Sequence, residues 1–132
     1  MTPPVLITLQ TVPDDARGFL SIAQMDSHLP FVVKRYFTMT GMHKGMVRGN
    51  HAHRAQSQFF NALNGVFELV VEGHMGMQTF KLDHPGQALN VPPLHWVTIT
   101  SLEDNGILLV CASDLYDSSD YICDHTEFKT LL

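Results

Sequence analysis

The sequence lacks the features of a membrane-spanning or exported chain. In its 132 residues no apolar run approaches the roughly 20 residues that a helix needs to cross a bilayer. The first residues, MTPPVLITLQTVPDD, contain neither the basic segment nor the long apolar stretch of a signal peptide. Only two cysteines occur, Cys111 and Cys123, and they form no CxxC pair. We therefore expect a cytoplasmic protein with reduced thiols and no membrane association.

The sequence also has little charge, and that charge is unevenly placed. Charged residues make up 16% of the chain and the formal net charge is -5, which argues against non-specific nucleic-acid binding. Residues 1–60 hold six basic and three acidic side chains, whereas residues 61–132 hold two basic and ten acidic ones. The basic cluster could bind a compact anion such as a pyrophosphate, or its charges could simply be solvated.

Helical periodicity is almost absent. Short segments rich in β-branched and aromatic residues alternate with Gly, Pro, Asn and Asp, as is typical of strands and turns. Asn64-Gly65 predicts a two-residue hairpin, because both turn positions of such a hairpin take positive φ. Only the tail, DHTEFKTLL, predicts a short helix. We expect one all-β domain over residues 1–132, built as a sandwich or barrel.

The stretch RGNHAHR, residues 48–54, carries two histidines that are two residues apart. On a strand, His51 and His53 would project from the same face. The spacing from Gly45 through the two histidines to Gln58 and Gly65 resembles the first motif of the cupin superfamily. This resemblance implies an all-β, cupin-type jelly-roll barrel.

A catalytic metal is not the favoured use of these histidines. A metal cupin needs three or four nitrogen or oxygen ligands. Gln58 stands where many metal cupins have a glutamate, Val97 replaces the histidine of the second cupin motif, and His95 is two positions short of it. Histidine titrates near neutral pH and suits acid/base catalysis, so we favour metal-free chemistry with no cofactor. A catalytic metal, or histidines that merely line the barrel, stay open as alternatives.

Further segments give a closer resemblance. DARGFL (15–20), LPFVVKRYF (29–37), RGNHAHRAQSQ (48–58), LNVPPLHW (89–96) and SDYICDHTEF (119–128) follow in an order that resembles the sugar-nucleotide 3,4-ketoisomerases. These cupins act on dTDP-4-dehydro-6-deoxyglucose. The resemblance implies transfer of the keto group from C4 to C3 through an enediol, without a cofactor. The dTDP-3-keto product would lead to 3-amino-3,6-dideoxy sugars of surface polysaccharides or glycosylated products.

The resemblance also implies roles for individual residues. His51 would be the base at the ring carbon, and His53 would move protons at the sugar oxygens. Tyr36 would be a second proton shuttle, with an ordinary strand tyrosine as the alternative reading. The candidates for substrate binding are three arginines suited to a diphosphate and three uncharged side chains: Arg48, Arg17, Arg35, Gln58, Trp96 and Tyr121.

The expected partners are a dTDP-sugar and a second copy of the chain, because the resemblance implies a homodimer with possible exchange of N-terminal strands. Three other functions remain open: a metal-dependent cupin enzyme, a non-catalytic sugar-nucleotide binding module, and a C3/C5 epimerase. Fold alone does not separate them, since one barrel hosts many chemistries.

Overall fold

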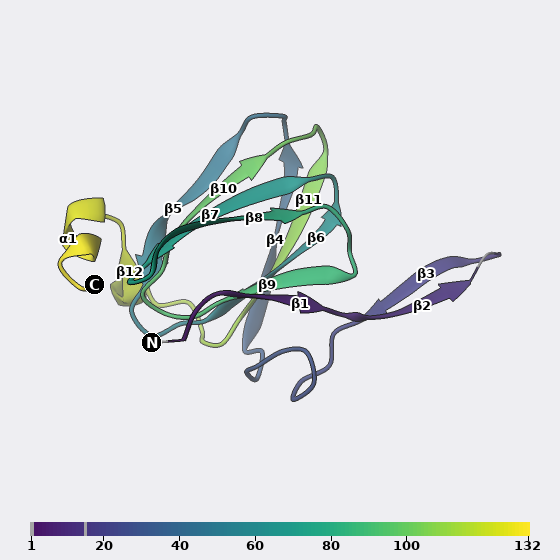
Figure 1. Cartoon of the computed structure of the whole chain (residues 1–132), viewed down its shortest axis with the longest axis horizontal. Helices are drawn as coiled ribbons and strands as arrows, with labels where there is room; N and C mark the ends of the chain where they lie inside the picture. Colours follow the sequence, from purple (N-terminus) through teal and green to yellow (C-terminus); the bar gives the residue numbers. More distant parts are fainter. Residues whose placement is uncertain (1, 15) are drawn as a thin grey trace.

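The computed structural model describes residues 2–14 and 16–132, and most of its strands form two antiparallel five-stranded sheets (Figure 1). The strand orders are β1-β9-β6-β11-β4 and β12-β5-β10-β7-β8, and β2 and β3 form a separate hairpin. The elements are β1 (Val5–Thr8), β2 (Gln10–Asp14), β3 (Gly18–Ile22), β4 (Arg35–Met42), β5 (Val47–His53), β6 (Gln58–Asn64), β7 (Phe67–Gly73), β8 (Gly76–Leu82), β9 (Gln87–Val91), β10 (Trp96–Ser101), β11 (Gly106–Ala112), η1 (Ser118–Asp120), β12 (Tyr121–Ile122) and α1 (His125–Lys129). The predicted all-β barrel with a short C-terminal helix is confirmed.

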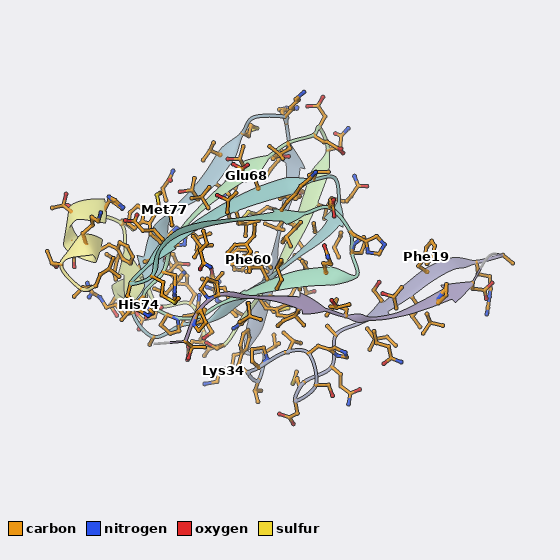
Figure 2. The ribbon with its side chains drawn as sticks, viewed as in Figure 1. Phe19, Lys34, Phe60, Glu68, His74 and Met77 are labelled. Carbon is orange, nitrogen blue, oxygen red and sulfur yellow. The ribbon has the colours of Figure 1, made fainter. Side chains whose placement is uncertain are left out.

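The core lies between the two sheets. Phe60 and Leu108 project from one sheet and Phe67 and Leu69 from the other, and each is almost fully buried. Figure 2 shows Phe60 in the interior of the barrel. Buried and less buried positions alternate along β10 and β11, because successive strand side chains point to opposite faces of a sheet. The core does not fill the whole space between the sheets, and the remaining space is the cavity described below.

The hairpin predicted at Asn64-Gly65 is wrong in its pairing. The chain does turn there, with Gly65 at a φ of +79°. However, β6 pairs with β9 and β11, whereas β7 pairs with β8 and β10. The turn therefore carries the chain from one sheet to the other. It passes close to Gly106, whose Cα would lie 3.1 Å from a Cβ placed on Gly65.

The β2–β3 hairpin projects from the barrel as an arm, at the end opposite α1 (Figure 1). It pairs with neither five-stranded sheet in the part of the chain that the structure describes. Val12, Phe19 and Leu20 on this arm are 43%, 74% and 60% exposed, and Figure 2 shows Phe19 far from the barrel interior. A hairpin alone is marginally stable in water, so this arm has apolar surface left to cover.

The C-terminal helix α1 fastens the tail to the barrel. Its Phe128 is buried against Trp96, with ring centroids 5.7 Å apart. Glu72 of β7 contacts His125 Nε2 at 2.6 Å and Lys129 Nζ at 3.2 Å. These contacts hold β12, which precedes α1, beside β5. No helix within residues 2–14 and 16–132 is long and apolar enough to cross a membrane.

Candidate active site

The histidine pair lies at the end of β5, where β12 joins its sheet. The rings of His51 and His53 are 5.0 Å apart and nearly perpendicular, so the predicted common face is confirmed. Tyr121 pairs with His53 across the β12–β5 ladder. Its ring centroid is 5.0 Å from that of His51 and 4.4 Å from that of His53. Three side chains capable of moving protons therefore form one cluster.

A cavity of about 340 Å³ opens beside this cluster, within the size range of small-molecule sites. Four polar side chains reach it from strands β5 and β6 and from the tail strand β12: Arg48, His51, Gln58 and Tyr121. The rest of its wall is mostly apolar and comes from both sheets: Phe37, Met39, Gly49, Phe60, Val97 and Ile99. A few convergent polar groups on an apolar wall are typical of a ligand site.

Arg48 lines the cavity because of a β-bulge in β5. Strict alternation would put Arg48 and His51 on opposite faces. Against β10, however, His51 pairs with Val97 and Gly49 with Thr98, which leaves Asn50 as an extra residue. Gly49 and Asn50 take φ of +88° and +58°. The bulge shifts the alternation by one residue and brings the guanidinium and the imidazole to the same cavity.

Burial keeps both imidazoles neutral. Burial lowers the pKa of His51, and a backbone contact with Gly49 only partly opposes it. Burial also lowers the pKa of His53, opposed by its hydrogen bond to Asp120, whose Oδ2 lies 2.9 Å from His53 Nδ1. A neutral imidazole has a free lone pair and can accept a proton. His51 lines the cavity and faces the space open to a ligand, whereas His53 packs against the His51 ring and is 6% exposed.

Asp120 was missed by the sequence analysis. It lies 67 residues from His53 along the chain, and the only local signal is its position directly before Tyr121 in the tail SDYICD. Because β12 carries the tail alongside β5, the carboxylate reaches the far side of the His53 ring. The folded tail thus supplies two side chains to the site, of which sequence reasoning selected only Tyr121.

Arg35 lies close to the histidine pair. Its guanidinium hydrogen-bonds Gln56 Oε1 and the Asp114 carbonyl, each at 3.3 Å. It stacks over Phe37 at 5.1 Å, and its charge contributes to lowering the pKa of His53. An arginine held beside the cavity in this way is well placed to meet an anionic ligand.

Tyr36, the predicted second proton shuttle, is not brought to the site within this chain. Along β4 the half-buried residues are Arg35, Phe37 and Met39, whereas Tyr36 is 71% exposed. Alternation therefore places Tyr36 on the outer face of β4 and Phe37 at the cavity. Among the described residues, Tyr121 is the tyrosine that lines the cavity.

Two other candidates also lie outside the cavity. Trp96 contacts α1 on the outer face of β10, with its ring 4.9 Å from that of His125, because the inward position next to it is Val97. Arg17 is near the tip of the β2–β3 arm, where it forms an ion pair with Asp14 and its side chain is 85% exposed. Trp96 therefore helps to dock the tail, and Arg17 does not reach the cavity of its own chain.

His95, the offset third histidine, is turned toward the backbone. Its Nδ1 lies 3.1 and 3.0 Å from the carbonyl oxygens of Pro92 and Pro93, and its ring packs on Gly73. Within residues 2–14 and 16–132, no group of three His, Cys, Asp or Glu side chains is arranged to hold a metal ion. Near the histidine pair the structure places the titratable side chains of Asp120 and Tyr121.

Comparison with known proteins agrees with this geometry. Residues 3–132 match the family described as FdtA: WxcM-like, C-terminal. A TDP-4-oxo-6-deoxy-α-D-glucose-3,4-oxoisomerase from Aneurinibacillus thermoaerophilus is 31% identical over 115 residues, which cover 87% of this chain and 83% of that protein.

Solved structures of a sugar 3,4-ketoisomerase from Thermoanaerobacterium thermosaccharolyticum are also similar. The complex with TDP has a TM-score of 0.90 at 27% identity, and covers 97% of this chain and 93% of its own. A variant in complex with TDP-4-keto-6-deoxyglucose has a TM-score of 0.92 at 26% identity, with coverages of 99% and 94%. The chain belongs to the FdtA family of sugar-nucleotide 3,4-ketoisomerases, which are isomerases with a cupin fold.

Proposed function

We propose that this protein converts TDP-4-keto-6-deoxyglucose into its TDP-3-keto isomer without a metal or other cofactor. The observation that carries the proposal is a neutral, half-buried His51 on the wall of a cavity that also holds Tyr121 and adjoins His53. Relatives that act on or bind this sugar nucleotide share the fold and the family.

The reaction moves two protons. The C4 carbonyl acidifies the proton on C3, and His51 removes it, which gives the C3–C4 enediol in its anionic form with the charge on the C4 oxygen. Transfer of the hydroxyl proton from the C3 oxygen to the C4 oxygen, and return of a proton from His51 to C4, then leave a C3 carbonyl and a C4 hydroxyl. No proton is gained or lost overall, so a base and a shuttle between the oxygens suffice. We assign the base to His51 and the shuttle to His53, with Tyr121 as the cavity hydroxyl beside them.

The basic side chains serve the diphosphate. Arg48 and Arg35 approach the cavity from β5 and β4, and a guanidinium binds phosphate oxygens through two parallel hydrogen bonds. Gln58 is 6% exposed on the cavity wall and offers an amide to a sugar hydroxyl. These contacts hold the substrate while the ring carbons face His51.

The active form we propose is a homodimer in which the β2–β3 arm lies on a second copy of the chain. The support is the exposed apolar surface of the arm and its lack of a strand partner among the described residues. Such an exchange would also give Arg17 a route to the partner's cavity. We further propose a cytoplasmic location, which suits the free thiols of Cys111 and Cys123.

Turnover of TDP-4-keto-6-deoxyglucose in the presence of EDTA tests this function. We expect the wild-type protein to give the 3-keto isomer. The His51→Asn variant should lose roughly 10²- to 10⁴-fold in kcat, because the base is removed, and should still bind TDP. His74→Asn, an exposed histidine in the β7–β8 turn, is the matched control and should react as wild type. Dependence on added Fe, Mn or Zn, or full activity of His51→Asn, would contradict the proposal.

A further inference from the structure

His53 and Asp120 form a buried pair beside the cavity, and this pair sets which ring nitrogen of His53 carries its hydrogen. His53 Nδ1 lies 2.9 Å from Asp120 Oδ2, and the two side chains are only 7% and 14% exposed. The rings of His51 and Tyr121, which both line the cavity, pack against His53. The pair is therefore dry and borders the part of the cavity wall formed by His51 and Tyr121, where the sugar would bind.

Asp120 is held in place by the backbone around it. Its second carboxylate oxygen, Oδ1, accepts a hydrogen bond from the Ala55 amide at 2.7 Å. Its carbonyl accepts one from the Arg54 amide at 2.9 Å, and its own amide donates to the Asp117 carbonyl at 3.1 Å. These bonds leave the carboxylate one orientation, in which Oδ2 faces the imidazole.

This geometry fixes the tautomer of His53. A carboxylate oxygen only accepts, so Nδ1 of His53 carries the hydrogen. In the neutral ring Nε2 then carries a lone pair and needs a donor. Nε2 is buried and has no hydrogen-bond partner among the described residues. A buried acceptor without a donor is costly, and a sugar hydroxyl is a group that could supply the missing hydrogen.

A purely structural clamp between β12 and β5 would not need this arrangement. The ladder already joins the two strands through Tyr121 and Ile122, and the Ala55 amide already holds the carboxylate. The contact with His53 adds a specific protonation state beside the cavity. The same carboxylate can also stabilise the imidazolium that forms when Nε2 takes up a proton, as a carboxylate does in other acid/base sites.

We propose that Asp120 is a positioning residue that locks His53 in the Nδ1–H tautomer, so that His53 Nε2 accepts the proton of one sugar oxygen and returns it to the other. This inference rests on the proposed isomerase function. The proton leaves the C3 oxygen, resides on Nε2 and ends on the C4 oxygen, so His53 is regenerated in each turnover. Nδ1 keeps its hydrogen throughout.

Asp120→Asn tests the lock, because an amide has only one accepting oxygen. If the Ala55 amide keeps that oxygen, the NH₂ group faces Nδ1 and forces His53 into the opposite tautomer. We expect ¹⁵N NMR of the imidazole nitrogens to show Nδ1–H in the wild-type protein and Nε2–H in the variant, with His53→Gln used to assign the signals. We expect kcat to fall roughly a hundredfold or more, with KM changed far less.

Asp117→Asn is the matched control. Asp117 caps η1 by accepting from the Ser119 amide at 2.9 Å, and asparagine caps equally well. This variant should keep both the tautomer of His53 and wild-type turnover. A loss in Asp117→Asn equal to that in Asp120→Asn would assign the effect to loop structure and overturn the proposal.

The tautomer of the wild-type protein decides the matter even if Asp120→Asn does not fold. Nε2–H or imidazolium in wild-type His53 at neutral pH overturns the inference, as does an Asp120→Asn variant that reacts within about threefold of wild type. If the wild type shows Nδ1–H but does not turn over TDP-4-keto-6-deoxyglucose, the lock stands and the proposed function fails. The two failures are therefore distinguishable.

Discussion

At the scale of single residues, the proposed reaction depends on two imidazoles that must be neutral to accept protons. Burial disfavours the charged form of His51 and His53 and lowers the pKa of each below the ordinary value of 6.5. Asp120 opposes this effect at His53 without reversing it. Both rings are therefore neutral at neutral pH and able to accept protons, and in the proposed reaction protonation of either one would interrupt the transfer.

This gives a signed prediction for pH dependence. Activity is full above the lowered pKa values and is lost as the pH falls through them, because the protonated base cannot remove the C3 proton. We expect the acid limb of the kcat/KM profile, which reports the free enzyme, to have its midpoint below 6.5. TDP affinity measured over the same range separates binding from chemistry. A midpoint above 6.5 would contradict the electrostatic account.

Whether a site residue could be predicted from the sequence depended on whether the sequence shows which face of its strand the side chain occupies. His51 and His53 could be predicted as a pair, because a spacing of two fixes a common face in any strand. In KRYF, by contrast, Tyr36 and Phe37 are adjacent aromatics, and sequence alone does not say which one faces inward. The structure turns Phe37 inward. The same uncertainty of phase applies to Trp96 and Val97 on β10.

At the scale of elements, the bulge in β5 decides which side chains meet. Gly49 takes a φ of +88°, and a Cβ placed on it would lie 2.6 Å from the Val97 carbonyl oxygen. Only glycine fits this close approach. The bulge could be read only in part from the dipeptide Gly49-Asn50, because its effect on Arg48 depends on the register with β10, which no local pattern encodes.

Replacement of this glycine should disturb both stability and binding. We expect Gly49→Ala to lower the free energy of unfolding by about 2–4 kcal/mol, from the positive φ and the clash together. TDP affinity should fall as well, since Arg48 moves. Gly76→Ala is the control, because Gly76 has a φ of +91° with nothing near its Cβ position and should cost only about 1 kcal/mol. Equal losses in urea denaturation of the two variants would contradict the clash.

The tail shows what sequence order alone does not reveal. Its short helix was predicted from the composition of residues 124–132, and α1 is present. Its anchoring by Glu72, and the delivery of Asp120 to His53, join residues more than 50 positions apart. Such contacts depend on which strands pair in the sheets, and a local sequence pattern does not show this. The pairing predicted at Asn64-Gly65 was wrong for the same reason: the sequence indicated the turn, but not that the two strands it joins belong to different sheets.

At the scale of the whole molecule, the β2–β3 arm is the feature that a single chain leaves unexplained. Phe19 is 74% exposed on it, and the proposed homodimer would bury this side chain. We expect light scattering to give about twice the 14.8 kDa mass of one chain. Phe19→Glu should weaken the dimer at least about tenfold, because it places a charge in an apolar contact.

Met77→Glu provides the control for this change. Met77 is 70% exposed on β8 and lies far from the arm (Figure 2). The variant should remain dimeric. A wild-type protein that is monomeric at micromolar concentration, or a Phe19→Glu variant with the wild-type mass, would exclude the arm as the dimer contact.

The central claim is that carbon-bound protons are removed and added at C3 and C4 and not at C5, with the proton on the base exchanging with solvent. Incubation of the protein with TDP-4-keto-6-deoxyglucose in deuterated water, with EDTA present and the ring protons followed by NMR, tests it most directly. The account predicts a 3-keto product that carries deuterium at C4, with the C5 proton untouched. Deuterium at C5 would indicate an epimerase, and absence of turnover in EDTA would contradict the proposed isomerase.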